Sequence, residues 1–468
     1  MASPLRIAAI FGLMTAALAT EADPNLLQTK LASTPYRLAD GLNKFARDVY
    51  GTVARGDSSN VVVSPFSLHT ALSMVFFGSP ANSETHDELV ELLGLPKQFY
   101  DDYAFNYLRL LSRYDATRRG GGKVTVGAAN KVYVDDTFVA KEAFLDFMRI
   151  FYRATVDQVD FADSFEASRA INRYVDAKTH GKIKNLLEPT DVDALTRIAL
   201  VNAIYFKGDW KTKFERSRTV ARPFTVAGET FQHPETMVTS GLFRMGDVAA
   251  LDATVLELPY ADEDYRMLVF LPRSNASGAV RDLDARLGSF DVNAIDGSLV
   301  RGRVLVELPK FKASGRAQLS QVFRELGART LFDSELANLT DISDEPDLYV
   351  QKVIHQAEVE VNEEGSEAAA ATAVIIGTRT AGGARKPRVF KANRPFVFVI
   401  QDRALGVPLF MGRIVDPSGR RRLGQGQLQG PQRLNRQVSA ALVARPPLQE
   451  EEAQESFLGP DGITFPEQ

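Results

Sequence analysis

The chain has 468 residues, with 55 basic and 59 acidic side chains and a formal net charge of −4. This length is ample for burying a large core, and the slightly acidic balance argues against a nucleic-acid-binding protein. The sequence contains no cysteine, which excludes disulfides, thiolate metal sites and a cysteine nucleophile.

The N-terminal segment has the pattern of a secretory signal. Arg6 precedes the apolar run Ile7–Leu18, and the segment ends in Ala17-Leu18-Ala19, which has the small residues of a cleavage site. A membrane anchor needs about 20 apolar residues, and this run is shorter. We therefore expect residues 1–19 to be a signal peptide and the mature protein to be secreted and extracellular, without a membrane-spanning segment.

Helices dominate the first part of the remaining chain. An amphipathic helix is predicted from the apolar residues Leu38, Leu42, Phe45, Ala46 and Val49, which recur on one helical face. A second helix begins at Ser64-Pro65, and a third covers Ser83 to Leu95. A basic connector, residues 118–123, then leads into a strand over residues 124–134.

Strands dominate the second part. After a helix over residues 170–187, the nearly continuous apolar run 198–206 is typical of a strand covered on both faces. Residues 303–308 and 351–361 alternate and predict further strands. Neither a linker nor a repeat interrupts residues 35–417, so we expect one large domain of the α+β class.

The composition changes after Pro417. Residues 418–468 are rich in Gln, Gly, Pro and Arg and end in an acidic run, Glu450 to Glu452. Such a segment buries too little apolar surface to fold alone. We expect a disordered C-terminal extension, whose role and processing the sequence does not indicate.

The most informative segment follows the alternating strand at Glu358–Val361. If Ser366 faces inward, a period of two places Ala368, Ala370 and Thr372 inward as well and Glu367 outward. All the inward residues are small, as a segment that enters a packed sheet requires. The whole segment consists of Gly365, Ser366, Glu367, Ala368, Ala369, Ala370, Ala371 and Thr372.

This segment resembles the reactive-centre hinge of the serpins, and other motifs support the resemblance. They stand in the family's order at residues 60–67 (NVVVSPFS), 200–210 (LVNAIYFKGDW), 390–396 (FKANRPF) and 410–413 (FMGR). The loop and the block after it look closest to the antithrombin-like branch. The resemblance implies a serpin domain over residues 35–417, with three β-sheets, about nine helices and an exposed reactive-centre loop at about residues 364–389.

The resemblance also implies a reactive bond. Counting from Gly365 as the fifteenth residue before the scissile bond places the cleavage at Arg379–Thr380, with Arg385 and Arg388 as competing sites. An arginine there suits a trypsin-like protease, whose pocket holds a carboxylate. The implied partner is thus a trypsin-like serine protease, held as a covalent acyl complex while the cleaved loop inserts into the central sheet.

Two further groups of residues carry over by motif. The shutter beneath the sheet corresponds to Ser64, Ser67, Asn202 and His355. The breach at the top of the sheet corresponds to Trp210, Lys310 and Glu363, with Lys310 and Glu363 expected to form an ion pair. The simpler interpretation of the shutter residues is that they are buried polar groups with satisfied hydrogen bonds, and both interpretations are compatible.

Catalytic and cofactor chemistry is not expected. The chain lacks the common hydrolase, nucleotide-binding and zinc-protease motifs, and its five histidines are not paired at metal-ligand spacing. The stretch Glu84 to Glu91, which we align with the basic fourth helix of antithrombin-like serpins, is acidic, so we do not expect glycosaminoglycan binding there. Two basic groups remain as alternative polyanion sites: Arg113, Arg118, Arg119 and Lys123, or Arg385, Lys386, Arg388 and Lys391.

We therefore predict a monomeric, secreted inhibitory serpin of the kind that regulates coagulation or innate immunity. The alternative is a non-inhibitory serpin that acts as a carrier, storage protein or chaperone, for which bulky or charged hinge residues would be expected. Asn275 and Asn338 begin glycosylation sequons.

Overall fold

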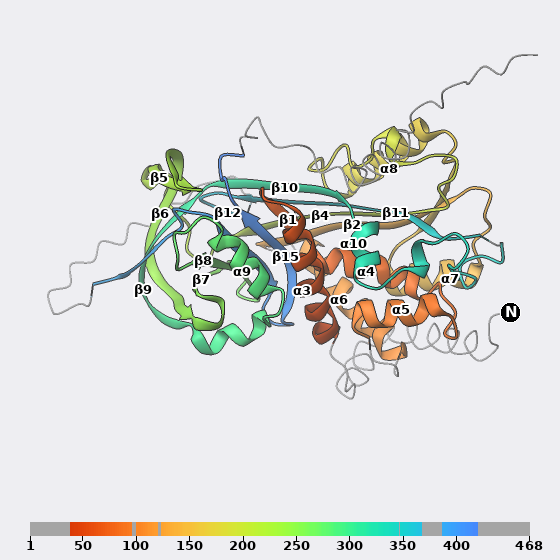
Figure 1. Cartoon of the computed structure of the whole chain (residues 1–468), viewed down its shortest axis with the longest axis horizontal. Helices are drawn as coiled ribbons and strands as arrows, with labels where there is room; N and C mark the ends of the chain where they lie inside the picture. The colour runs from red at the N-terminus through yellow and green to blue at the C-terminus, as the bar shows by residue number, and fades with distance from the viewer. Residues whose placement is uncertain (1–37, 96–99, 120–122, 346, 367–385, 420–468) are drawn as a thin grey trace, which may run out of the picture. The chain divides into compact units, whose positions relative to one another are not determined.

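The computed structural model describes residues 38–95, 100–119, 123–345, 347–366 and 386–419. The predicted signal peptide, the hinge from Glu367 to Thr372, the bond Arg379–Thr380 and nearly all of the C-terminal extension lie outside these residues. The described chain forms helices and two large sheets that share one core (Figure 1). None of the described helices combines the length and the apolar character needed to cross a membrane.

The first helices follow the predicted pattern. Helix α3 (Leu38–Gly56) buries the apolar positions that the sequence singled out. Helix α4 (Pro65–Phe76) begins at Ser64, whose side chain accepts a hydrogen bond from the Ser67 N–H, and Pro65 occupies the first turn. Every residue of α4 is buried. The predicted third helix is α5 (Glu84–Leu93), capped by Ser83 and ended by Gly94 in the left-handed conformation.

Two helices differ from the sequence predictions. Helix α6 (Tyr100–Arg119) was missed, because its polar and apolar residues show only weak helical periodicity. Helix α8 (Ser164–Lys178) begins and ends earlier than predicted. Asp163 caps its start, and the positive φ angles of His180 and Gly181 turn the chain away after its end. The other α-helices among the described residues are α7 (Glu142–Phe147), α9 (Ala279–Leu287) and α10 (Ser320–Glu325).

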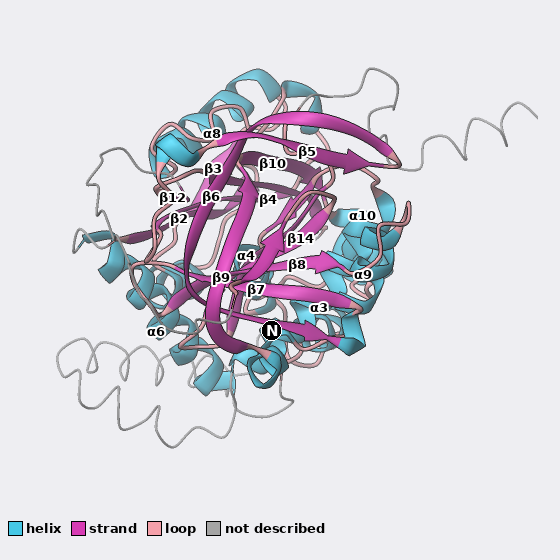
Figure 2. Cartoon of the chain, turned by 90° about the vertical axis from the view of Figure 1, so that its left-hand side faces the viewer, coloured by secondary structure: helices cyan, strands magenta, loops and turns pink. Residues whose placement is uncertain are grey.

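Among the described residues, the larger sheet has nine strands. In spatial order they are β1 (Val61–Val63), β15 (Val407–Ile414), β14 (Phe396–Asp402), β8 (Tyr265–Pro272), β7 (Ala253–Pro259), β6 (Glu229–Val248), β9 (Val300–Pro309) and β13 (Arg388–Lys391), with β5 (Val220–Val226) paired to β6. Figure 2 shows the long strands β6 and β9 on the side that faces the viewer. Three sheets were expected, but β6 pairs with β5 and β9 along one part and with β7 along another, so hydrogen bonds join two of them.

The second, central sheet contains six strands in the part of the chain that the structure describes. Its order is β10 (Phe311–Gln318), β11 (Val350–Val361), β4 (Ile198–Asp209), β2 (Val124–Asp135) and β3 (Val156–Val159), and the short β12 (Gly365–Ser366) also pairs with β4. The strands predicted from residues 124–134, 198–206 and 351–361 are confirmed as β2, β4 and β11. Strands β4 and β11 are parallel neighbours.

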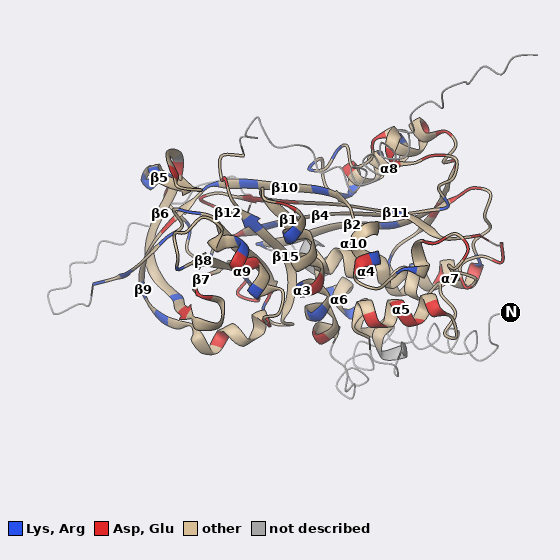
Figure 3. Cartoon of the chain, in the orientation of Figure 1, with Lys and Arg blue, Asp and Glu red and all other residues tan. Residues whose placement is uncertain are grey.

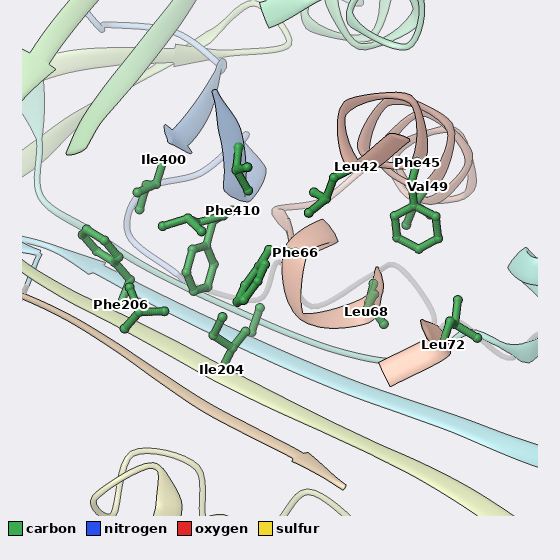
Figure 4. Close-up of a cluster of buried hydrophobic side chains, with 14 of the residues drawn as sticks. Leu42, Phe45, Val49, Phe66, Leu68, Leu72, Ile204, Phe206, Ile400 and Phe410 are labelled. Carbon is green, nitrogen blue, oxygen red and sulfur yellow. The ribbon is translucent and has the colours of Figure 1, made fainter. Parts of the chain in front are cut away.

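The core lies between the helices and the two sheets. Phe66 on α4 packs in one cluster with Ile204 and Phe206 on β4 and with Phe410 on β15 (Figure 4). All four side chains are fully or almost fully buried. Burying a side chain of this size stabilises the fold by about 1.5–3 kcal/mol. Helix α4 therefore packs between β15 and β4.

Candidate functional site

The site that the sequence predicts centres on the boundary between β4 and β11, which we call the seam. The two strands pair in register from Ile198 opposite Val350 to Tyr205 opposite Glu358, with one irregularity near Lys352. Asn202 lies directly opposite His355 at the middle of the seam. A strand entering here would have to separate these hydrogen-bonded neighbours, so any group that joins the two strands would oppose its entry.

The four predicted shutter residues meet at this point. The backbone N–H of Ser64 donates to His355 Nε2 at 3.1 Å, and His355 Nδ1–H donates to the Asn202 side-chain oxygen. The Asn202 side-chain N–H donates to Ser67 Oγ at 2.7 Å. Each of the four residues is at most 1% exposed. The network therefore joins β11, β4 and the start of α4 across the seam.

A fifth member of this network was not predicted. Asn130 on β2 accepts hydrogen bonds from the Asn202 amide and from Ser67 Oγ, each at 2.7 Å. It lies directly opposite Asn202 in the β2–β4 register. In the sequence, Asn130 is only a polar residue inside a predicted strand. Nothing in the sequence indicates that its partner lies on another strand. Asn130 extends the network from two central strands to three.

His355 is held in its neutral form. Burial lowers the pKa of His355 from 6.5 to about 3, although the hydrogen bond with Asn202 acts in the opposite direction. The geometry explains why: a second proton on Nε2 would face the Ser64 N–H, which is itself a donor. Protonation thus removes the bond that ties β11 to the start of α4.

We expect acid to destabilise the protein through this residue. A histidine whose pKa is depressed in the folded state stabilises the fold fully above its unfolded pKa of about 6.5, and the contribution is lost as the pH falls towards 3. The loss is about 1.4 kcal/mol per pH unit, so about 3 kcal/mol by pH 4.5. Denaturant unfolding between pH 7 and pH 4.5 measures this slope.

His355→Gln should flatten that slope, because glutamine keeps one donor and one acceptor but does not titrate. His180→Gln is the matched control, since His180 is exposed. Equal slopes for wild type and His355→Gln would show that other groups cause the acid sensitivity.

The first hinge residues lie at the Asp209 end of β4. Gly365 and Ser366 form β12, which is antiparallel to β4 at Asp209 and Gly208. The chain reverses from β11 through a turn in which Asn362 Oδ1 accepts the N–H groups of Glu364 and Gly365, at 3.0 and 3.3 Å. A side chain at Gly365 would meet the Gly208 carbonyl oxygen at 1.9 Å, so only glycine fits.

Ser366 points into the protein. It is fully buried, and its hydroxyl lies 2.9 Å from the hydroxyl of Tyr260. The premise of the sequence prediction, an inward Ser366, is therefore confirmed. The positions that alternate with it, from Glu367 onward, lie outside the described residues.

Trp210 anchors the same turn. Its indole N–H donates to the Asn362 carbonyl at 3.0 Å, and its backbone N–H donates to the Glu364 carbonyl at 2.8 Å. The indole also stacks on the Tyr260 ring, with centroids 4.6 Å apart. Trp210 and Tyr260 thus pack against the segment that joins β11 to the hinge.

Lys310 and Glu363 form the predicted ion pair, but each of them makes a shorter contact with another residue. Lys310 lies 3.5 Å from Glu363 and 2.8 Å from Glu235. Glu363 accepts a shorter hydrogen bond, 2.7 Å, from the Thr219 hydroxyl. The neighbouring Glu364, which the sequence analysis did not single out, is buried and pairs with Lys213 at 2.6 Å. Two buried carboxylates therefore fix the start of the hinge.

The acidic stretch that we aligned with the family's fourth helix belongs to another element. It forms α5, and α6 is the fourth described helix of the chain. Figure 3 shows the acidic residues along α5. On α6, Arg113 is bound by Asp264 at 2.8 Å and by Asp402 at 3.1 Å. Its charge is thus largely compensated, and it offers little to a polyanion.

The two sequons differ in exposure. Asn275 is exposed, whereas Asn338 is half-buried, and its side-chain oxygen accepts a hydrogen bond from Thr340. Glycosylation at both sites stays a prediction.

Comparisons with known proteins agree with this architecture. The family profile described as serpin (serine protease inhibitor) matches residues 40–417. Human Serpin B8 is 34% identical over 81% of this chain and 99% of its own length. The crystal structure of Serpin48 from Tenebrio molitor, described as a highly specific serpin, superposes with a TM-score of 0.72 at 29% identity, covering 81% of this chain and 97% of that one.

A second structure, native protease nexin-1 with heparin, gives a TM-score of 0.71 at 29% identity, covering 81% of this chain and 99% of that chain. The match extends over nearly the whole of each relative. The chain belongs to the serpin family.

Proposed function

We propose that this protein is a secreted inhibitor of extracellular trypsin-like serine proteases, which it traps by cleavage at Arg379–Thr380. The observation that carries the proposal is the position of β12. Gly365 and Ser366 lie antiparallel to β4, with Ser366 buried. The hinge therefore starts antiparallel to β4, as a strand inserted along β4 requires. It starts beyond Tyr205, where the pairing of β4 with β11 has ended.

The proposed reaction begins as ordinary proteolysis. The protease's serine oxygen bonds to the carbonyl carbon of Arg379, the bond to Thr380 breaks, and the new amine of Thr380 leaves with the serine's proton. The freed chain then enters the seam between β4 and β11. Fifteen residues at about 3.3 Å each carry the acylated protease roughly 50 Å. The protease is displaced before water can hydrolyse the ester.

The contacts at the seam support this proposal. Hydrogen bonds of Asn202 and His355 cross the seam beside the backbone pairing of β4 with β11. Opening the seam breaks this polar network and one set of backbone hydrogen bonds, and the entering strand supplies new backbone hydrogen bonds on both sides. We propose that the shutter residues set the barrier to insertion and that Trp210 and Glu363 hold the hinge at its entrance.

Incubation with trypsin followed by a denaturing gel tests the proposal. A complex that resists sodium dodecyl sulfate, larger than either protein, is expected for an inhibitor. Cleavage without a complex would instead favour the carrier, storage or chaperone function. We expect the inhibitor to act as a monomer and without a cofactor, so added heparin should leave the rate of complex formation unchanged.

Arg379→Ala should abolish inhibition of trypsin and leave the fold intact, because a single loop residue contributes little to stability. The loss of a charged pocket contact should lower the inhibition rate by at least about a hundredfold. Arg385→Ala is the matched control and should inhibit normally. If the two results are exchanged, the reactive bond follows Arg385.

A further inference from the structure

A cavity of about 130 Å³ opens between three segments that lie far apart in the sequence. Its walls come from the turn between β5 and β6, from the chain that joins β8 to α9, and from the corner between β13 and β14. Two of these segments are tied together, because the Thr225 N–H donates to the Asn393 carbonyl at 2.9 Å. We call this site the Arg394 cavity. None of the residues that line it belongs to the seam or to the shutter.

Much of the cavity wall is apolar. The residues that line it include Pro272, Ala276, Ala279, Val280 and Pro395. An apolar cavity of about 150 Å³ holds a benzene molecule, so the Arg394 cavity has room for a group of about that size. It is too small for drug-sized ligands, whose pockets measure about 300–1,000 Å³.

One wall carries a guanidinium group. Arg394 is half-buried; its Nε and Nη2 both donate to the Pro272 carbonyl, and its Nη1 donates to Asn393 Oδ1 at 3.0 Å. Because a guanidinium has five N–H donors, two of them have no acceptor among the described residues. The three hydrogen bonds also hold Arg394 in place, which reduces the conformational entropy that binding a ligand would cost.

Arg394 also lacks a counter-charge. It forms no ion pair with any carboxylate of the described residues, and burial alone acts on its pKa, which it lowers. Arg113 and Arg244 are also half-buried, yet each of them contacts two carboxylates. Since removing a cation from water without a partner is costly, the Arg394 cavity favours an anionic ligand.

We propose that the Arg394 cavity binds a small organic carboxylate whose apolar part is about the size of a benzene ring. The carboxylate accepts hydrogen bonds from the two free N–H groups of Arg394, and the apolar part packs against Pro272, Ala279 and Val280. Charge-assisted hydrogen bonds of this kind are roughly twice as strong as neutral ones. The proposal goes beyond protease inhibition and does not depend on it, because no residue of the seam or the shutter takes part.

Isothermal titration calorimetry with benzoate tests the proposal on the full chain, prepared without N-glycosylation because Asn275 lines the cavity. Benzoate should bind saturably with a dissociation constant of about 1 mM or lower, a modest affinity for a ligand of its size. At about twenty times the dissociation constant, benzoate should raise the melting temperature by roughly 2 °C.

Two further ligands separate the charge from the apolar part. Benzamide has nearly the same shape as benzoate without the charge, and it should bind at least about tenfold more weakly. Inorganic phosphate has the charge without the apolar part, and it should also bind at least about tenfold more weakly, because it leaves the apolar wall uncovered.

Variants locate the bound benzoate. Arg394→Gln should weaken binding at least about tenfold, whereas Arg173→Gln, the same change at an exposed arginine on α8, should not alter it. Ala279→Leu should abolish binding, because the larger side chain fills the cavity and leaves Arg394 in place. Ala285→Leu, at an exposed position of α9, is its matched control. Leucine suits a helix nearly as well as alanine, so both leucine variants should fold.

Absence of saturable benzoate binding to the wild-type protein overturns the proposal. Equal affinities for benzoate and benzamide would show that Arg394 does not select the charge, and equal affinities for benzoate and phosphate would show that the apolar wall is not used; either result overturns it. Unchanged affinity in Ala279→Leu would place the bound benzoate outside the cavity and overturns it as well. These outcomes decide the question even where Arg394→Gln fails to fold.

Discussion

Ala370→Arg is expected to convert the protein from an inhibitor into a substrate. Ser366 is buried against Tyr260 in a strand antiparallel to β4. If that strand extends along the seam, every second residue faces the core, and Ala370 is one of them. An arginine there would enter an apolar interior without a partner, at a cost of several kcal/mol.

This cost acts on a competition between two rates. After acylation at Arg379, insertion competes with hydrolysis of the ester. A penalty of about 3 kcal/mol in the insertion step slows it roughly a hundredfold. Hydrolysis then completes, and active protease is released with the loop cut. The measurement is the stoichiometry of inhibition, titrated with trypsin, which should rise from near one to above about ten.

Ala369→Arg provides the matched control. Position 369 has the opposite parity, so its side chain should project away from the core during insertion, and inhibition should be largely retained. Both variants should still be cleaved at Arg379–Thr380. If the two arginine variants inhibit equally well, the hinge does not enter the seam in the register that Ser366 defines.

Secondary structure was predicted most accurately in segments whose sequence is compatible with only one local structure. The run from Ser64 to Ser67 begins a helix with a serine cap and a proline in the first turn, and the structure places both as expected. The apolar run 198–206 required a strand covered on both faces, and β4 is one. In these segments, local propensity and burial favour the same structure.

Contacts between distant elements were predicted less well. Asn130 joins the shutter from a strand 72 residues before Asn202, and no local pattern marks it. The partners of Lys310 and Glu363 include Glu235 and Thr219, which only the folded chain brings near. Helix α6 was missed because tertiary packing stabilises a helix whose own periodicity is weak.

Cleavage of the loop between Gly377 and Thr380 is expected to raise the melting temperature, whereas nicking usually destabilises a folded protein. The freed segment from Ser366 to Ile376 would become a strand between β4 and β11. It replaces one set of hydrogen bonds along the seam by two. Its small inward side chains, together with Val374 and Ile376, would be buried at the same time.

The expected size follows from the number of residues that insert. About eleven residues, each contributing roughly 1 kcal/mol net, stabilise the cleaved form by about 10 kcal/mol. Unfolding entropy for a domain of about 385 residues is about 0.8 kcal/mol per kelvin, so the midpoint should rise by roughly 10 °C or more. A melting curve before and after limited cleavage, with a protease that is not trapped, measures the shift.

The cleaved Ala370→Arg variant separates strand insertion from any general effect of cleavage. Its arginine opposes insertion, so its melting temperature should rise less than that of cleaved wild type, or not at all. Mass spectrometry must confirm the same cleavage site in both. An unchanged or lower midpoint for cleaved wild type would mean that the seam between Asn202 and His355 does not open to admit the loop. The protein would then be a serpin that binds or carries rather than traps, because a loop that cannot insert cannot displace an acylated protease before its ester is hydrolysed.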